Sequence, residues 1–138
     1  MDGASWPRLA VAGALALMAV VLPASAQAPS LRALAQIEPG RWQLRDMDDG
    51  TSRSMCVTDP RTLLQLRHAT AGSCSRFVIE DAPRLSTVHY TCAGAGHGRT
   101  SITIETPRLI RITTQGLAGG LPFETRIEAR RTGSCGTT

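Results

Sequence analysis

The sequence contains no lysine, so that all 15 of its basic side chains are arginines. The formal net charge is +4, but the arginines are spread along the chain among acidic residues. This distribution is typical of a genomic composition bias and not of a nucleic-acid-binding surface. We therefore predict no nucleic-acid partner, while contact of a basic protein with an anionic membrane surface stays open.

Aromatic residues are scarce, at 4% of the chain. Beyond residue 26 only four remain, namely Trp42, Phe77, Tyr90 and Phe123. The core must then come mostly from Ile, Leu, Val and Met. A chain of this size buries only about 60 to 70% of its unfolded surface. Such a core is thin, and covalent cross-links would help to stabilise it.

Recognisable catalytic and metal motifs are also missing. His68, His89 and His97 lack the close paired spacing of a zinc motif, and no G-x-S-x-G elbow is present. The glycines of residues 94–98 are expected to join two strands, whereas phosphate-binding loops precede a helix. We predict no metal and no cofactor.

A His-centred hydrolase stays open as the alternative, and its components would come from Ser86 or Ser101, His89 or His97, and Asp46, Asp48 or Asp49.

The longest apolar run extends from Leu9 to Leu22, after Arg8 and before the cleavage-like segment 23–26, Pro-Ala-Ser-Ala. A membrane span needs roughly 20 apolar residues, and this run is shorter. We therefore interpret residues 1–26 as a signal peptide that is cut after Ala26. The expected product is periplasmic or secreted, with no stable membrane insertion after cleavage.

All four cysteines, Cys56, Cys74, Cys92 and Cys135, follow the predicted export signal. Cysteines in an exported protein are more often paired than metal-bound. We therefore expect two disulfides in the mature chain.

Beyond residue 38 the sequence alternates polar and apolar residues between short turns, a pattern typical of antiparallel strands. Asp59-Pro60 favours a helix start, because Asp59 can cap free N–H groups and Pro60 needs no donor in the first turn. Residues 27–38 are expected to form a short amphipathic helix or a leader. Residues 39–136 are predicted to be a single, mainly β domain with about seven antiparallel strands in a curled sheet or partly open barrel, and one or two short helices. The strands are expected at residues 41–45, 51–57, 76–80, 85–92, 99–106, 108–115 and 121–130.

Two segments fit this scheme less simply. Phe77, Val78 and Ile79 are consecutive apolar residues, so their strand is expected either to be buried on both faces or to contain a bulge. In the last strand, Glu124, Arg126, Glu128 and Arg130 share one face. We interpret this charged stripe as a solvated sheet face rather than a docking site.

Four cysteines allow three disulfide pairings. In the hairpin that turns at residues 81–84, Cys74 and Cys92 fall opposite each other, where a disulfide can form. This leaves Cys56 to pair with Cys135 if the helix carries the chain back across the sheet. The preferred pairing is Cys74–Cys92 with Cys56–Cys135, and Cys56–Cys74 with Cys92–Cys135 is the alternative.

Several segments together resemble an exported bacterial family, domain of unknown function 3617. The similarity covers roughly residues 38–135. It implies a secreted or periplasmic β-rich domain with no assigned activity, so no catalytic residue transfers. The matching segments are Pro39-Gly40-Arg41-Trp42, Cys56-Val57-Thr58-Asp59-Pro60, Cys74 with Tyr90-Thr91-Cys92, and the closing Arg130-Arg131-Thr132-Gly133-Ser134-Cys135.

These observations predict a non-catalytic exported module that binds either an apolar small molecule inside a curled sheet or another envelope protein. The small periplasmic hydrolase is the alternative function.

Overall fold

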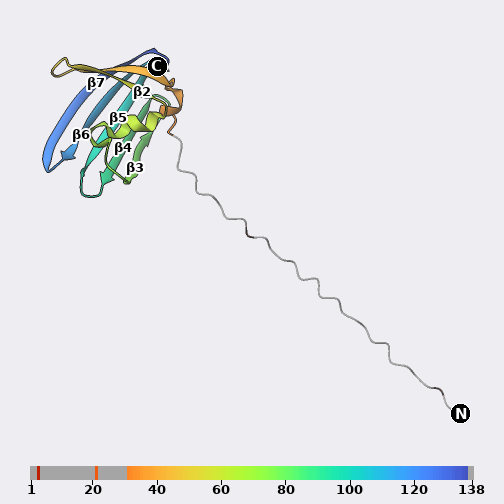
Figure 1. The fold of residues 1–138 in the computed structure, drawn as a ribbon. Coiled ribbons are helices and arrows are strands. Elements are labelled where there is room, and N and C mark those ends of the chain that lie inside the picture. The colour runs from red at the N-terminus through yellow and green to blue at the C-terminus, as the bar shows by residue number, and fades with distance from the viewer. Residues whose placement is uncertain (1–2, 4–20, 22–30, 137–138) are drawn as a thin grey trace.

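The structure is a computed structural model that describes Gly3, Val21 and residues 31–136. Within residues 31–136, seven antiparallel strands form one open sheet in the order β2-β1-β7-β6-β5-β4-β3. Figure 1 shows that this sheet curls around a helical segment on its concave side. The strands are β1 (Gly40–Asp46), β2 (Ser52–Val57), β3 (Cys74–Asp81), β4 (Leu85–Cys92), β5 (Gly96–Thr106), β6 (Leu109–Ala118) and β7 (Leu121–Gly133).

The predicted mainly β fold, its antiparallel strands and its curled sheet are confirmed, and the sheet does not close into a barrel. The predicted signal peptide, residues 1–26, and residues 27–30 of the predicted leader lie outside the described residues, apart from Gly3 and Val21.

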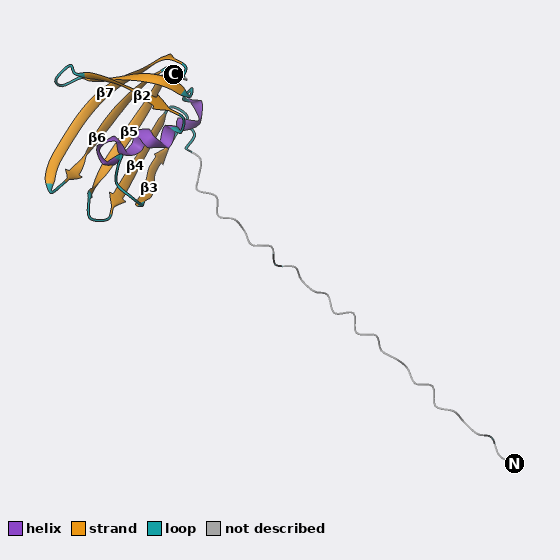
Figure 2. Cartoon of the chain, in the orientation of Figure 1, coloured by secondary structure: helices purple, strands orange, loops and turns teal. Residues whose placement is uncertain are grey.

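In the described part of the chain, two helical segments accompany the sheet (Figure 2). Both are of the 3₁₀ type. The first, η1 (Leu34–Gln36), is a single turn within the segment predicted to be a short amphipathic helix or a leader. The second, η2 (Pro60–His68), has non-helical backbone angles at Gln65, where two shorter pieces meet. Runs of 3₁₀ helix longer than three or four residues are uncommon. The kink at Gln65 divides the nine residues of η2 into two shorter 3₁₀ pieces.

The segment η2 carries the chain from one edge of the sheet to the other. It follows β2, precedes β3 and lies over β4, β5 and β6. The sequence between Val57 and Cys74 crosses the concave face, because β2 and β3 are the two edge strands. The core therefore lies between that face and the helical segments. Its largest fully buried apolar side chains are Trp42, Leu63, Leu64, Ile102, Ile110 and Ile112.

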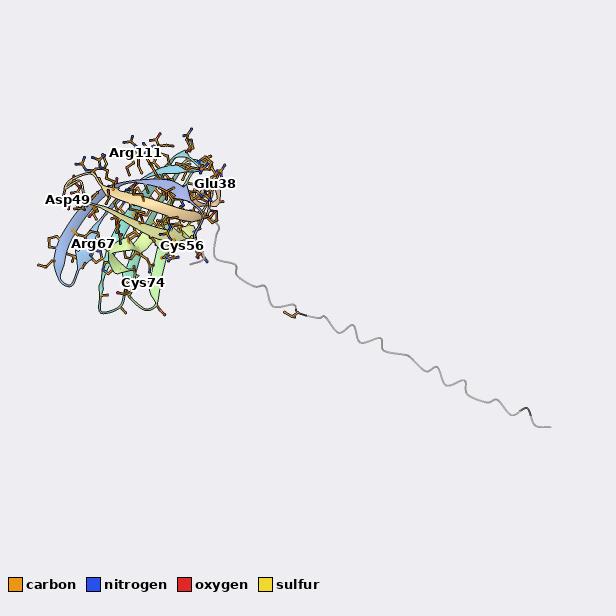
Figure 3. All side chains as sticks on the ribbon, turned by 45° about the horizontal axis from the view of Figure 1, so that its top comes forward. Glu38, Asp49, Cys56, Arg67, Cys74 and Arg111 are labelled. Atoms are coloured by element: carbon orange, nitrogen blue, oxygen red, sulfur yellow. A yellow bond between two sulfur atoms is a disulfide. The ribbon has the colours of Figure 1, made fainter. Side chains whose placement is uncertain are left out.

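The two disulfides join Cys56 to Cys135 and Cys74 to Cys92, which is the preferred pairing. Cys74 and Cys92 are directly opposed in the β3–β4 ladder, with Cα atoms 4.2 Å apart. Cys135 lies just beyond β7 and reaches past β1 to β2. Cys56 and Cys74 are labelled in Figure 3. Both edge strands are thus covalently fastened, and unpaired edges are the part of a sheet most open to non-native pairing.

The register decides between the two alternatives predicted for the strand of Phe77, Val78 and Ile79. The ladder of β3 with β4 shifts between Val78 and Glu80, so the consecutive apolar residues mark a bulge. The strand is not buried on both faces, because Phe77 is 69% exposed and Ile79 is 43% exposed. The extra residue of a bulge places neighbouring side chains on unexpected faces, which accounts for the broken alternation.

The sequence predicts that residues 94–98 form a hairpin connection. This prediction is wrong for residues 96–98. Gly96 and Gly98 belong to β5. A Cβ atom on Gly98 would lie 2.5 Å from the Tyr90 hydroxyl oxygen, and one on Gly96 would lie 2.0 Å from the Leu117 carbonyl oxygen. These positions are glycine because neighbouring atoms approach the backbone too closely for a side chain.

Candidate functional site

The concave face and η2 are joined by a chain of buried hydrogen bonds. Nε2 of His68 lies 3.2 Å from the Ala95 carbonyl oxygen, which only accepts, so Nε2 carries the hydrogen. Nδ1 of His68 then accepts from the Tyr90 hydroxyl at 2.8 Å. Burial raises the pKa of Tyr90, while the neighbouring Thr114 side chain and the charge of Arg67 act in the opposite direction. The phenol therefore keeps its hydrogen as a donor to His68.

A second pair of hydroxyls fixes the middle of η2. Thr100 donates to the Leu64 carbonyl oxygen at 2.7 Å, and its own oxygen lies 2.8 Å from the Thr114 hydroxyl. Because Thr100 has used its only hydrogen, Thr114 is the donor between them. Both threonines are buried on the concave face. Buried bonds of this kind favour a single position of η2, because a shift would leave polar groups without partners.

An apolar groove of about 540 Å³ lies between η1, η2 and strands β3 and β4. Its volume falls within the roughly 300 to 1,000 Å³ typical of small-molecule sites. All but two of the residues that line it are apolar. Leu64 of η2 and Val88 of β4 are almost fully buried there, whereas Val78 of β3 is partly buried. The remaining apolar lining comes from prolines and from Leu31, Leu34, Ala35 and Ile37 in and next to η1.

The two polar residues of the groove are arginines at its mouth, Arg61 and Arg76. Arg61 pairs with Asp59 at 2.7 Å, and Asp59 also accepts from the Arg61 backbone N–H at 2.9 Å as the N-cap of η2. The side-chain hydrogen bond from Arg61 lowers the pKa of Asp59, and the charge of Arg76 adds to this effect. Arg76 donates to the Gln65 side-chain oxygen at 2.8 Å. No salt bridge of residues 31–136 includes Arg76.

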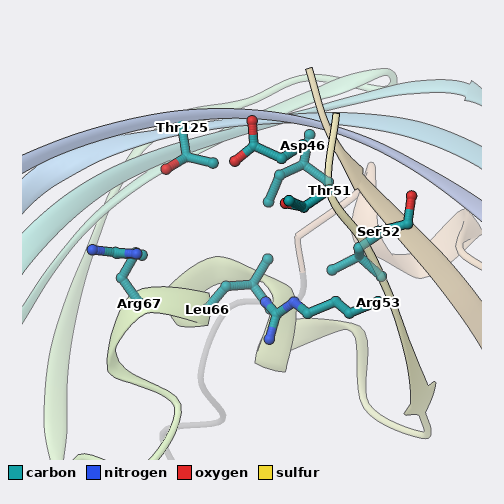
Figure 4. Close-up of a pocket in the computed structure, with 9 residues that line it drawn as sticks. Asp46, Thr51, Ser52, Arg53, Leu66, Arg67 and Thr125 are labelled. Atoms are coloured by element: carbon teal, nitrogen blue, oxygen red, sulfur yellow. The ribbon is translucent and has the colours of Figure 1, made fainter. Parts of the chain in front are cut away.

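A second pocket of about 300 Å³ lies on the other side of η2, against β1, β2 and β7 (Figure 4). Its lining is more polar, and two of its three charged groups, those of Asp46 and Arg67, already have partners within the fold. Asp46 accepts from the Asp48 backbone N–H at 2.8 Å and so stabilises its own turn. The Arg67 guanidinium lies 5.1 Å from the centre of the Phe123 ring, a cation–π arrangement. This pocket is therefore the weaker binding candidate.

Within residues 31–136, no hydrogen bond joins a serine to His89 or His97, the two histidines considered for a hydrolase. His68 is buried on the concave side, while the His89 and His97 rings lie 5.6 Å apart on the opposite face. Ser101 shares that face, but its hydroxyl lies 2.9 Å from the Thr87 hydroxyl. Ser86 is fully buried on the concave face, and its hydroxyl has no hydrogen-bond partner in the described part of the chain.

The three candidate aspartates belong to the β1–β2 turn and its surroundings. Asp46 caps the turn, and Asp49 accepts from the Thr51 hydroxyl at 2.7 Å. Asp48 forms a salt bridge with Arg126 of the charged stripe in β7. In the same stripe Arg130 pairs with Glu128 at 3.1 Å. The aspartates thus have local structural partners and, within residues 31–136, none hydrogen-bonds a histidine.

Three general features follow from the described residues. Between residues 31 and 136 the structure gathers no group of three or more His, Cys, Asp or Glu side chains suited to a metal ion. Neither helical segment there has the length and apolar character needed to cross a bilayer. The paired cysteines are typical of a protein outside the cytoplasm.

No protein-family model, curated protein or solved structure matches this chain.

The sequence predicts an apolar small-molecule site in a curled sheet, but it does not identify most of the residues that line the groove. Within residues 27–38, Leu31, Leu34 and Ile37 recur at helical spacing, and all three line the groove. Arg76 and Val88 carried no such signal. They join the groove only because η2 crosses the sheet above β3 and β4.

Proposed function

We propose that this chain is an exported, non-catalytic binding module that holds an apolar small molecule in the groove between η1, η2, β3 and β4. The single observation that supports this function best is the groove itself, with its volume of about 540 Å³ and its almost wholly apolar lining. Sites for small apolar ligands combine a concave apolar surface with a few polar groups, as this groove does.

We place the protein in the periplasm or in the secreted fraction, and within the family known as domain of unknown function 3617. The signal-like residues 1–26 and the paired cysteines support the location. The order and spacing of the segments around Trp42, Asp59, Tyr90 and Cys135 support the family.

The experiment uses residues 27–138 with both disulfides formed, titrated with the neutral fluorescent probe N-phenyl-1-naphthylamine. Saturable binding of one probe per chain is expected. Ala35 is an exposed groove residue, so an Ala35→Trp variant would fill the groove with an indole ring. The matched control is Ala69→Trp, at an exposed position just after η2.

Loss of probe binding in Ala35→Trp, with binding kept in Ala69→Trp, would support the proposal. Absence of saturable binding, or equal binding by both variants, would contradict it. A broad esterase, phosphatase and peptidase panel tests the hydrolase alternative on the same protein. Activity that disappears on substituting His89 or His97 would replace the binding function with catalysis.

Docking of an envelope protein is a second candidate, and one observation favours it. β3 is an edge strand that carries the exposed side chains of Phe77 and Ile79. An exposed apolar edge is a surface on which another chain can pair. Native mass spectrometry of protein purified from periplasm would detect such a partner, and Phe77→Asp should abolish the complex. A complex that survives this substitution would exclude β3 as the docking edge.

A further inference from the structure

The mouth of the apolar groove carries an excess positive charge. Two guanidinium groups, those of Arg61 and Arg76, line it, and the carboxylate of Asp59 interacts with both of them. Arg61 is held by that carboxylate through three donors, its backbone N–H at 2.9 Å, its Nε at 3.0 Å from both oxygens and its Nη2 at 2.7 Å. Its charge is therefore largely neutralised within the fold.

Arg76 is differently placed. Its hydrogen-bond partner is the neutral amide of Gln65, and none of the salt bridges between residues 31 and 136 involves it. The side chain is exposed on the edge strand β3, two residues before Val78. Residues two apart on a strand point to the same face, so a guanidinium and an apolar wall lie next to each other. A cation beside an apolar wall matches a molecule with an anionic end and an apolar tail.

We propose that the ligand of the groove is a long-chain carboxylate, with its head group on Arg76 and its alkyl chain against Leu64, Val78 and Val88. This inference rests on the binding function proposed above and names the ligand class of the same site. A planar guanidinium presents parallel N–H donors that match the two oxygens of a carboxylate. The mouth also has one positive charge in excess, which suits a monoanion, whereas a phosphate monoester carries roughly 1.5 to 2 negative charges at neutral pH.

The test compares two ligands with identical tails and different heads. The oxidised chain of residues 27–138 is titrated calorimetrically with dodecanoate and with 1-dodecanol, below the concentrations at which they aggregate. We expect dodecanoate to bind about tenfold or more tightly than the alcohol, because charge-assisted hydrogen bonds are about twice as strong as neutral ones. Dodecyl phosphate forms a third arm and is expected to bind more weakly than dodecanoate.

Arg76→Gln removes the cation at the mouth and keeps a side chain that can hydrogen-bond. Its dodecanoate affinity is expected to fall about tenfold, while its dodecanol affinity stays unchanged and shows that the groove remains folded. The matched control is Arg99→Gln, because Arg99 lies on the opposite face of the sheet in the same row as His89. This variant removes the same charge from the molecule and should bind both ligands like the parent chain.

Equal affinity for dodecanoate and dodecanol, or an equal loss for both in Arg76→Gln, would overturn the carboxylate assignment and leave the binding function standing. Tighter binding of dodecyl phosphate would also overturn it. Failure to bind any of the three ligands, together with failure to bind the neutral probe, would overturn both proposals. A dimer that excludes dodecanoate in sedimentation experiments would assign the groove to a second copy of the chain, against this inference.

Discussion

Reducing the Cys56–Cys135 disulfide is expected to lower the free energy of unfolding more than reducing the Cys74–Cys92 disulfide. The residues joined by the two bridges are separated by 79 and 18 positions in the sequence. In the chain-entropy description, loops of these lengths correspond to about 4.5 and about 3.2 kcal/mol at 25 °C, a difference of about 1.3 kcal/mol. Either value is a large share of the roughly 5 to 15 kcal/mol that stabilises a typical domain.

The assay is urea unfolding of two double variants, each with and without reductant. The variant Cys74→Ala/Cys92→Ala retains the long-range bridge, and Cys56→Ala/Cys135→Ala retains the hairpin bridge. Each variant's own reduced form is its reference, so the packing lost on replacing Cys92, which is only 2% exposed, cancels. A hairpin bridge that contributes as much as the long-range bridge would refute the loop-entropy explanation.

Three further substitutions test the packing, the buried polar network and the cap of η2. Gly98→Ala would place a Cβ atom 2.5 Å from the Tyr90 hydroxyl oxygen and is expected to cost about 1 to 3 kcal/mol in urea unfolding; Gly72→Ala, which meets nothing within 4 Å, should cost far less. Thr100→Val leaves the Leu64 carbonyl without its donor and is expected to cost about 1 to 3 kcal/mol, whereas the exposed control Thr103→Val should be nearly neutral, and equal effects would contradict the network. The pKa of Asp59 is lowered in the folded chain, chiefly by its hydrogen bond to Arg61, so its stabilising effect is present above its unfolded pKa and is lost as the pH falls through its folded pKa. Asp59→Asn should therefore show a shallower loss of thermal stability than the parent chain below about pH 4, the usual range of an Asp side chain; parallel acid profiles would exclude that contribution.

The sheet was predictable because its signals are local. Alternation along residues 85–92 gives the bounds of β4 without error, and the turn at residues 81–84 sets Cys74 opposite Cys92. The N-cap at Asp59 was equally local and is confirmed by its bond to the Arg61 backbone N–H. Residues that stabilise an element through their immediate neighbours can be recognised from their order alone.

What the sequence hid depends on contacts between distant strands. Gly96 and Gly98 are typical of a loop, yet they lie in β5. Glycine is required at both positions because Leu117 and Tyr90 approach the backbone closely. The groove is hidden for the same reason, since Arg76 and Val88 become its wall only when η2 crosses above them. Close approach across a sheet leaves no periodic mark in a single sequence.

The open sheet and the groove have one physical origin. The strands β2 and β3 are consecutive in the chain but lie at opposite edges of the sheet. The segment between them crosses the concave face, where η2 occupies the space that would be the interior of a closed barrel. The buried bonds of His68 and Thr100 hold η2 over β4 and β5, and the space left beside it becomes the groove. Its outer wall is β3, an edge strand with a neighbour on one side only. The Cys74–Cys92 disulfide fastens this wall two residues from Arg76, so reducing that bridge should loosen the mouth of the groove before it unfolds the core.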